Sequence, residues 1–499
     1  MIYQNPILRG FHPDPSICRV GEDYYLVVSS FEYFPGIPIY HSRDLVNWRQ
    51  IGNCLQSSEE FPLLPVGDSG GVWAPTIRWD HGLFYVTATL EGYGNFIVTA
   101  QDPAGEWSSP VWVKEVGGID PSLYFEDGHA YYCTNDRLDD SGEMISMQEI
   151  DPKTGAIIGK RHMLWRGTGR HFMEAPHVYH IDGWYYLMVA EGGTFFTHCV
   201  TIARSRSMWG PYESCPHNPI LTSIGDASWQ IQCSGHADLI EDAHGQWWMM
   251  HLGIRLARRT MTHLGRETFL APVRWENGWP IGGREGMAML CNEGPEAAVQ
   301  EPLRPFIANM KVKDWEPEWL FLRRLDRARY DRSGDALVLM PSPQTLDDPV
   351  PTFAALRPLD FDCITETTFV FVPSCAADEA GLAVRLDHQF YITCTIRNQF
   401  DARMLTLTIH AEQIHHIVAS VAVPDGPLTL RMTASHEAYR FDYAVDGNQA
   451  YLGQASTRFV ATELSGRCFT GTVIGLYTTG AADTAAKMIV HDFRMLPAE

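Results

Sequence analysis

The chain has 499 residues, of which 60 are Asp or Glu and 38 are Lys or Arg, so its formal net charge is −22 at pH 7. This acidic excess argues against binding to nucleic acid, whose phosphates are recognised through Lys and Arg, and favours a neutral ligand. Hydrophobic residues make up 45% and charged residues 20% of the chain, which is the composition of a folded globular protein. A single core seldom serves a chain of this length, so we expect two or more domains.

The N-terminus and the cysteines bear on the compartment in which the chain works. Residues 1–6 contain no basic segment, apolar core or small-residue cleavage site, and no apolar run approaches the ~18 residues of a membrane span. The 11 cysteines are scattered and form no Cys-x-x-Cys pair. An odd number of cysteines without a secretion signal predicts reduced thiols, not disulfides or a zinc site. We therefore expect a cytoplasmic protein that has no membrane partner.

A short pattern recurs in the N-terminal part of the chain. Glycines followed by an apolar or aromatic run are separated by 46 to 62 residues, at Gly21, Gly82, Gly128, Gly183 and Gly245. A second strand-like run begins shortly before each glycine, so each copy predicts a β-hairpin. A hairpin that recurs at this spacing, with room for two more strands between copies, is typical of the four-stranded blades of a propeller. We predict an all-β chain in which residues 1–300 form a five-bladed β-propeller.

The beginnings of these repeats predict a pocket. One strand of each propeller blade lines the central channel, so residues at the start of the inner strands should converge on one axis. These positions hold Asp14, Trp73 with Ala74, Asp120, Glu174 and His236. Three carboxylates, an aromatic side chain and a histidine would then face one cavity.

The repeat pattern ends after Trp279 and Pro280, and a second domain follows. Residues 301–317 predict a connector between the domains. Residues 318–499 contain short strand-like runs in which apolar and polar residues alternate, and polar turns separate these runs. This pattern predicts a jelly-roll-like β-sandwich. The expected strands cover residues 367–372, 390–394, 405–409, 428–432, 439–443 and 473–477.

The carboxylates at the repeated position allow two interpretations. Asp-Pro and Glu-Ala-Pro segments can be turn chemistry alone, because Asp favours turns and Pro stops strand pairing. Burying three carboxylates close together is costly, however, unless they are hydrogen-bonded or used. Two carboxyl groups that flank a glycosidic bond can hydrolyse it, the ionised one by activating water and the protonated one by donating to the leaving oxygen. A third negative charge nearby would keep the acid protonated.

At these residues the chain resembles a known family. The strings NPILRGFHPDPSI (residues 5–17), GIDPSL (118–123) and EAPH (174–177) are similar to those of glycoside hydrolase family 43 β-xylosidases. The resemblance continues through GVWAP (71–75), AEGGT (190–194), GHADL (235–239) and GRETFL (265–270). It implies a five-bladed propeller with a C-terminal β-sandwich and an inverting, exo-acting enzyme that removes terminal xylose from β-1,4-xylo-oligosaccharides, with α-L-arabinofuranosidase side activity.

The resemblance also implies roles for single residues. Asp14 would be the general base, Glu174 the general acid, and Asp120 the residue that tunes the acid and orients the sugar. The residues expected to bind the sugar are Phe31, Trp73, Thr194, His236, Arg266 and Phe469. Core packing is the alternative for the aromatic residues, and a turn is the alternative for Thr194. No cofactor is required for this chemistry, but a divalent cation such as Ca²⁺ near His236 is a second interpretation of that histidine.

Other functions stay open at this point. A dedicated α-L-arabinofuranosidase would keep the three carboxylates and change the pocket walls, whereas a non-catalytic sugar-binding propeller would lose Asp14 or Glu174. The sequence departs from the family pattern at Cys233-Ser234 and at Phe195-Phe196-Thr197, so the fine substrate preference is not fixed by the resemblance. The same resemblance implies a small oligosaccharide as the partner in solution and a homo-oligomer, either a dimer or a tetramer.

Overall fold

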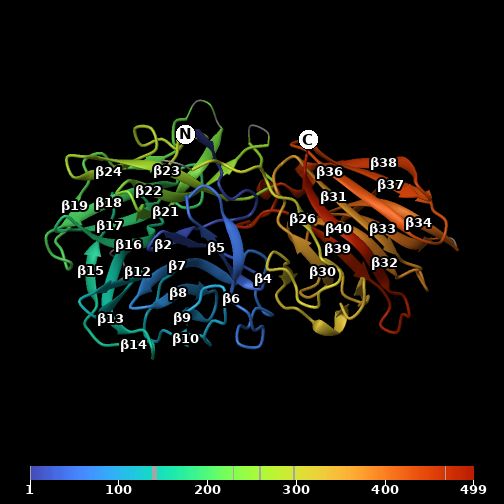
Figure 1. Ribbon diagram of the computed structural model, residues 1–499, viewed down its shortest axis with the longest axis horizontal. Helices are drawn as coiled ribbons and strands as arrows, with labels where there is room; N and C mark the ends of the chain where they lie inside the picture. Colours follow the sequence, from blue (N-terminus) through green and yellow to red (C-terminus); the bar gives the residue numbers. More distant parts are fainter. Residues whose placement is uncertain are drawn as a thin grey trace.

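The computed structural model describes residues 2–137, 143–226, 228, 230–257, 260–295, 298–399, 401–466 and 468–498. Figure 1 shows two β-rich bodies side by side, the N-terminal one in blue to green and the C-terminal one in orange to red. The first body is a β-propeller and the second is a β-sandwich. The all-β fold and these two architectures, both predicted from the sequence, are confirmed.

Each sequence repeat supplies one antiparallel sheet of the propeller. The first sheet contains β2 (Ser16–Val20), β3 (Asp23–Val27), β5 (Gly36–Ser42) and β6 (Arg49–Leu55). The second contains β7 (Val72–Asp80), β8 (Leu83–Leu90), β9 (Gly94–Ala100) and β10 (Val111–Trp112). The third contains β11 (Ser122–Glu126), β12 (His129–Arg137), β13 (Glu143–Asp151), β14 (Ala156–Ile157) and β15 (His162–Trp165).

The remaining propeller sheets follow the same plan. The fourth contains β16 (Glu174–Ile181), β17 (Trp184–Glu191), β18 (Cys199–Ser205), β19 (Glu213–Ser214) and β20 (Leu221–Thr222). The fifth contains β21 (Ile231–Glu241), β22 (Trp247–Arg255), β23 (Glu267–Glu276) and β24 (Trp279–Gly282). Two short strands, β1 (Ile2–Gln4) and β25 (Cys291–Glu293), pair with each other.

The first strand of each sheet lies at the centre of the propeller. These inner strands contact one another in the order β2, β7, β11, β16 and β21, and β21 contacts β2 again, which closes a ring. The repeated glycine that follows each inner strand has positive φ, between 65° and 84°. In the hairpin from β7 to β8, His81 also has positive φ, 46°, before Gly82, as a two-residue type I′ turn requires. The periodic glycine therefore marks the turn that joins the two inner strands of each blade.

An unusual backbone conformation also repeats at the entrance to the inner strands. The residues there have φ values between 41° and 57°, in the left-handed region, and they are Asp14, Ala74, Asp120, Ala175 and His236. None of them is glycine, so each turn is strained and is held by the surrounding fold. Glu174 and Trp73 each precede the strained alanine of their own blade, beside a β-bulge in the pairing of the inner strand. Bulges of this kind redirect side chains.

The C-terminal domain consists of two packed antiparallel sheets. One contains β26 (Phe306–Ile307), β28 (Tyr330–Asp331), β29 (Leu337–Leu339), β40 (Met488–Pro497), β31 (Cys363–Val370), β36 (Leu428–Ala434), β37 (Ala438–Val445) and β38 (Asn448–Ser456). The other contains β30 (Thr352–Leu356), β39 (Val473–Thr479), β32 (Glu379–Arg385), β33 (Phe390–Gln399), β34 (Ala402–Ala411) and β35 (Ile414–Ala422). All the sandwich strands expected from the sequence are present, and residues such as Leu382, Ile392 and Phe441 form the core between the sheets.

Helical structure is sparse. The described residues contain short 3₁₀ helices, η2 (Arg327–Arg329), η3 (Thr457–Val460) and η4 (Thr462–Leu464). No helix in the part of the chain that the structure describes has the length and apolar character to cross a bilayer.

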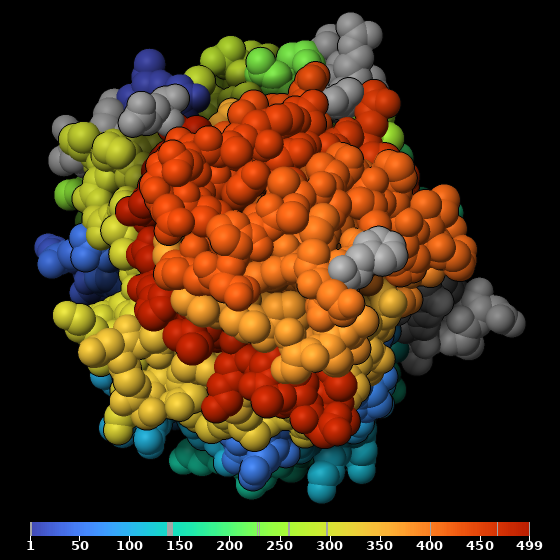
Figure 2. All heavy atoms as spheres, turned by 90° about the vertical axis from the view of Figure 1, so that its right-hand side faces the viewer, coloured from blue at the N-terminus to red at the C-terminus, as the bar shows by residue number. Residues whose placement is uncertain are grey.

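The two domains share a core and a pair of strands. Strand β4 (Tyr33–Phe34) of the propeller pairs with β27 (Phe321–Leu322), and buried residues of both domains, among them Phe31 and Tyr477, form one cluster. Figure 2 shows the sandwich covering the centre of one face of the molecule, with the propeller visible around its margin. Strand β26 lies within the predicted connector but pairs with β40. The boundaries at residues 300 and 317 stay predictions.

Candidate active site

A cavity of about 210 Å³ lies at the entrance to the inner strands. It is lined by Asp14, Phe31, Trp73, Ala74, Ile119, Asp120, Glu174, Thr194, His198, His236, Arg266 and Phe469. The structure therefore brings together all the site residues expected from the sequence, and it adds Ile119 and His198. A larger groove, of about 870 Å³ beside Trp48 and Arg304, contains none of the residues at the repeated position. The smaller cavity is the better candidate for chemistry, since only it gathers the three carboxyl groups.

Asp14 is held as a carboxylate. Arg266 Nη1 donates to Asp14 Oδ1 at 2.6 Å, and Ser29 Oγ donates to Oδ2 at 2.6 Å. His236 Nδ1 lies 3.7 Å from Oδ1. Burial alone would raise the pKa of Asp14, but the charges of Arg266 and His236 and the Ser29 hydrogen bond outweigh burial, so its pKa is lowered. Asp14 is thus ionised at neutral pH and able to accept a proton from water.

Glu174 has the opposite tendency. Burial, followed by the negative charge of Asp14, raises the pKa of Glu174 to about 7. Its carboxyl group makes no hydrogen bond to the residues that the structure describes, and it is partly exposed because it lines the cavity. A carboxyl group without a charged donor stays protonated over much of the neutral range. Glu174 can therefore donate a proton in the same pH range in which Asp14 accepts one.

Asp120 lies within the influence of the other two carboxyl groups. Burial, followed by the negative charges of Glu174 and Asp14, raises the pKa of Asp120 well above its ordinary value. From the sequence we expect the charge of Asp120 to keep Glu174 protonated. In the structure, burial and the charge of Asp14 are the largest causes of the raised pKa of Glu174. The tuning role of Asp120 stays a prediction.

Aromatic side chains from both domains form one wall of the cavity. The ring centroid of Phe469, from the sandwich, lies 6.2 Å from that of Phe31 and 6.4 Å from that of Trp73. Arg266 donates to the Phe469 carbonyl oxygen through Nε at 3.2 Å and Nη2 at 3.0 Å. The Arg266 guanidinium, which stabilises the Asp14 carboxylate, therefore also holds the sandwich loop that carries Phe469 against the cavity. Apolar rings of this kind can cover the apolar face of a pyranose.

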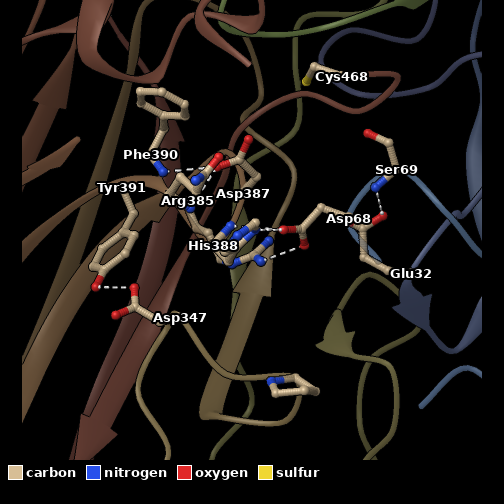
Figure 3. A network of polar contacts seen from close by, with 12 residues as sticks. Glu32, Asp68, Ser69, Asp347, Arg385, Asp387, His388, Phe390, Tyr391 and Cys468 are labelled. Atoms are coloured by element: carbon tan, nitrogen blue, oxygen red, sulfur yellow. Dashed lines mark hydrogen bonds and ion pairs between the residues drawn. The ribbon is translucent and has the colours of Figure 1, made fainter. Parts of the chain in front are cut away.

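A polar network fixes this closure between the domains (Figure 3). The Phe469 N–H donates to Ser69 Oγ at 2.8 Å, and Trp73 Nε1 donates to the Ser69 carbonyl oxygen at 3.2 Å. The neighbouring Asp68 accepts from Arg385 Nη2 at 2.7 Å and lies 2.6 Å from His388 Nδ1, both in the sandwich. Ser69 thus links Trp73 and Phe469 of the aromatic wall, and Asp68 next to it in the chain binds the second domain.

His198 is a cavity residue that the sequence analysis did not identify. Its Nδ1 lies 2.9 Å from the carbonyl oxygen of Cys233, which can only accept a hydrogen bond, so Nδ1 carries the hydrogen. Burial lowers the pKa of His198 to about 3, and the ring is therefore neutral. Nε2 is then an acceptor, and no partner for it is found among the described residues.

His236 and Thr194 both line the cavity, as expected. His236 Nδ1 also lies 4.0 Å from Asp120 Oδ2. Within the described ranges, no group of three or more His, Cys, Asp or Glu side chains has the arrangement to hold a metal ion. The divalent cation near His236 stays a prediction.

Comparisons with known proteins agree with this site. Residues 3–280 match the family described as glycosyl hydrolases family 43, and residues 311–495 match the β-xylosidase C-terminal concanavalin A-like domain. A non-reducing end α-L-arabinofuranosidase of Bacteroides ovatus is 37% identical over 99% of this chain and 95% of its own. A xylosidase/arabinosidase of Butyrivibrio fibrisolvens is 46% identical over 56% of each chain.

A solved structure extends the likeness to the whole fold. The GH43B protein of a Bacteroides ovatus xyloglucan PUL superposes with a TM-score of 0.94 at 36% sequence identity, covering 100% of both chains. Both domains and their arrangement are therefore shared. With the family match over the propeller and the carboxyl groups at its centre, the chain belongs to glycosyl hydrolase family 43.

Proposed function

We propose that the protein is an inverting exo-glycosidase that removes terminal non-reducing xylose from short β-1,4-xylo-oligosaccharides. The observation that carries the proposal is the pair of carboxyl groups in one cavity, with the pKa of Asp14 lowered and that of Glu174 raised to about 7. Hydrolysis of a glycosidic bond needs one group in each protonation state.

In this mechanism a water molecule lies between Asp14 and the anomeric carbon. Asp14 takes a proton from the water as its oxygen attacks, and Glu174 gives its proton to the oxygen of the departing sugar. The C–O bond to the leaving sugar breaks on the face opposite to the new bond, so the anomeric configuration inverts. Asp14 ends protonated and Glu174 ionised, and proton exchange with solvent restores both groups.

The size of the cavity supports an exo mode of action. A volume of about 210 Å³ is below the ~300–1,000 Å³ of pockets that enclose drug-sized ligands. Phe31, Trp73 and Phe469 close one side, so the cavity has room for one terminal sugar and not for the interior of a chain. Arg266, His236, Thr194 and Asp120 provide polar groups for the sugar hydroxyls.

Proton NMR of the first-formed product tests this proposal. With xylobiose or an aryl β-xyloside, inversion releases α-xylose before mutarotation mixes the anomers. Initial release of β-xylose would contradict the assignment of Asp14 as base. With xylotetraose, removal of one terminal xylose gives xylose and xylotriose first, so xylobiose as the first-formed product would contradict the exo mode.

A dedicated α-L-arabinofuranosidase is the second candidate. The Bacteroides ovatus relative that spans nearly the entire chain carries that name, while the Butyrivibrio fibrisolvens relative is named for both activities. The ratio of kcat/KM for an aryl β-xyloside and an aryl α-L-arabinofuranoside decides between them. A preference for the xyloside supports the main proposal with arabinofuranosidase side activity, and the reverse preference supports the alternative. The dimer or tetramer implied by the family resemblance belongs to the same proposal, and light scattering tests it.

A further inference from the structure

Three exposed phenylalanines lie next to catalytic cavity residues in the sequence. Phe172, Phe195 and Phe196 are 50%, 61% and 48% exposed. Phe172 stands two residues before Glu174, and Phe195 directly follows Thr194, whose Cα is therefore about 3.8 Å away. Glu174 and Thr194 line the cavity, whereas these phenylalanines do not. The aromatic residues thus lie outside the cavity, beside the group that we assign as the acid.

The rings of Phe172 and Phe195 form one unit across a glycine. Their centroids are 6.3 Å apart. A Cβ atom added to Gly193 would lie 3.0 Å from the Phe172 ring and 3.2 Å from the Phe195 ring, and the φ of Gly193 is 66°. The backbone angle therefore favours glycine at this position, and an added Cβ atom would crowd both rings. Phe172 itself has a φ of 58°, a strained conformation for a bulky residue and one that accompanies functional sites.

Backbone hydrogen bonds hold the two loops that carry these rings. The Gly192 N–H donates to the carbonyl oxygen of His171 at 2.8 Å, which joins the loop before β16 to the loop after β17. Thr197 Oγ1 donates to the Gly192 carbonyl oxygen at 2.8 Å. The His198 N–H donates to the Phe195 carbonyl oxygen at 3.0 Å. The backbone of both loops is therefore held, and it presents apolar rings to water, which indicates a ligand for them.

We propose that Phe172 and Phe195 form a binding subsite for the leaving-group sugar of the substrate. This inference rests on the proposed function, because it takes Glu174 as the acid. The leaving oxygen must lie next to Glu174 when it receives the proton, and the sugar attached to that oxygen lies outside a cavity that holds one residue. Phe172 and Phe195 stand next in the chain to Met173-Glu174 and to Thr194, and Glu174 and Thr194 line the cavity, so we place the emerging sugar against this pair. Stacking on the apolar face of a pyranose is the chemistry that the pair offers.

The subsite is a determinant of leaving-group preference. A leaving group with a sugar ring gains contact with Phe172 and Phe195, whereas a fluoride ion gains none. This binding contact lies outside the cavity. It therefore raises kcat/KM for oligosaccharides without altering the groups that break the glycosidic bond. Phe196 lies next in the chain, and its exposure makes it the position at which the subsite could extend to a second sugar.

Phe195→Ala and Phe172→Ala, compared on two substrates, test the proposal. For xylobiose we expect kcat/KM to fall roughly 3- to 10-fold in each variant, the usual worth of an aromatic stacking contact. For β-xylosyl fluoride, whose leaving group has no ring, we expect kcat/KM to stay within about 2-fold, because nothing at the stacking site is lost. Phe459→Ala, at a 39% exposed phenylalanine of the sandwich, is the matched control and should change neither value. Phe195→Trp, which keeps a stacking face, should restore the xylobiose value.

The outcomes separate this inference from the proposed function. Equal loss on xylobiose and on the fluoride would overturn the subsite, because the rings would then act through the cavity, and so would an unchanged xylobiose value. A melting temperature that falls only in the alanine variants would point to a structural role. If the wild-type protein hydrolyses no β-xyloside, the proposed function fails independently, and the same comparison is then made with an arabinofuranosyl disaccharide and arabinofuranosyl fluoride.

Discussion

The two sides of the cavity, one around Asp14 and the other around Glu174, differ in their supply of positive charge and donors. Asp14 receives a guanidinium and a hydroxyl, at 2.6 Å each. Glu174 receives no hydrogen-bond donor from the described residues, and after burial the largest effect on its pKa is that of the Asp14 carboxylate, which raises it. Both side chains come from the start of an inner propeller strand, so the repeat itself does not distinguish them.

This difference shows that the residues around each carboxyl group, and not its position in the repeat, decide whether it acts as base or as acid. Arg266 directly precedes β23 of the fifth blade, and Ser29 follows β3 of the first blade, so Asp14 gains its donors from the loops beside it. Glu174 precedes a strained alanine and a β-bulge in the fourth blade, where no equivalent donor from the described part of the chain reaches it. One carboxyl group thus becomes a base and the other an acid.

Asp14→Ala should cause the largest loss of activity. Without the base, water is not activated for any substrate, so kcat/KM should fall about 10²- to 10⁴-fold. The loss should be similar for xylobiose and for an aryl xyloside with an acidic phenol, since both need the same attack by water. Steady-state kinetics on the two substrates provide the measurement. A variant that spares the aryl xyloside would indicate that Asp14 is the acid.

Glu174→Ala should discriminate between the same substrates. An alkoxide leaving from xylobiose needs a proton, so its kcat/KM should fall about 10²- to 10⁴-fold. The phenolate of an acidic phenol leaves without that proton, so kcat/KM for the aryl xyloside should fall only about 10-fold or less. The ratio of the two losses, compared with the ratio for Asp14→Ala, is the quantity to measure. Equal losses in both variants would remove the distinction between the two sides of the cavity.

Arg266→Met should reduce the difference in positive charge between the surroundings of Asp14 and those of Glu174, while it leaves both carboxyl groups in place. Losing a charge-assisted hydrogen bond costs about 1.5–3 kcal/mol, or roughly 10- to 150-fold in kcat/KM. The charge of Arg266 lowers the pKa of both Asp14 and Glu174, so its removal should raise both values. Activity needs ionised Asp14 and protonated Glu174, and therefore both limbs of the pH profile should move to higher pH.

Arg266→Lys provides the control for this shift. It keeps a positive charge but not the fork of donors that reaches Asp14 and Phe469 together. We expect its pH profile to lie closer to that of the wild type while kcat/KM still falls. Limbs that move in opposite directions in Arg266→Met would show that Arg266 does not act on both carboxyl groups. Circular dichroism checks that each variant is folded.

Much of this arrangement could be predicted from the sequence because the propeller is a repeat. The glycine of each hairpin turn recurs in the sequence and has positive φ in the structure, so Asp14, Asp120 and Glu174 could be aligned before their positions were known. The family resemblance added residues outside the repeat position, such as Arg266 and Phe469. The sandwich strands followed from their alternation of apolar and polar residues.

Other features could not be predicted, because they depend on contacts between distant segments. Asp68 and Arg385 are 317 positions apart in the chain. No local sequence pattern predicts their ion pair, because it forms only when the two domains pack together. His198 lies outside the repeated position, and its role depends on the carbonyl group of Cys233. The opposite pKa shifts of Asp14 and Glu174 arise from surroundings that a repeat alignment does not contain.

Glu143→Gln should give the smallest effect and test the acid side alone. The negative charge of Glu143 contributes to the raised pKa of Glu174, after burial and the charge of Asp14. Glu143 also accepts from the Met173 N–H at 3.0 Å, a bond that glutamine can keep. The variant should therefore lower the pKa of Glu174. Because Glu174 must be protonated, the basic limb of the kcat/KM profile, expected near a pH of about 7 in the wild type, should move to lower pH.

The acidic limb should not move in Glu143→Gln, since Glu143 is not among the charges that set the pKa of Asp14. Glu149→Gln is a matched control on the same strand, β13; this residue pairs with His129 at 2.7 Å and does not contribute to the pKa of Glu174. Its profile should coincide with that of the wild type at both limbs. If Glu143→Gln moves the acidic limb and leaves the basic one in place, then Glu143 acts on the base, and the group that must be protonated for catalysis is not Glu174.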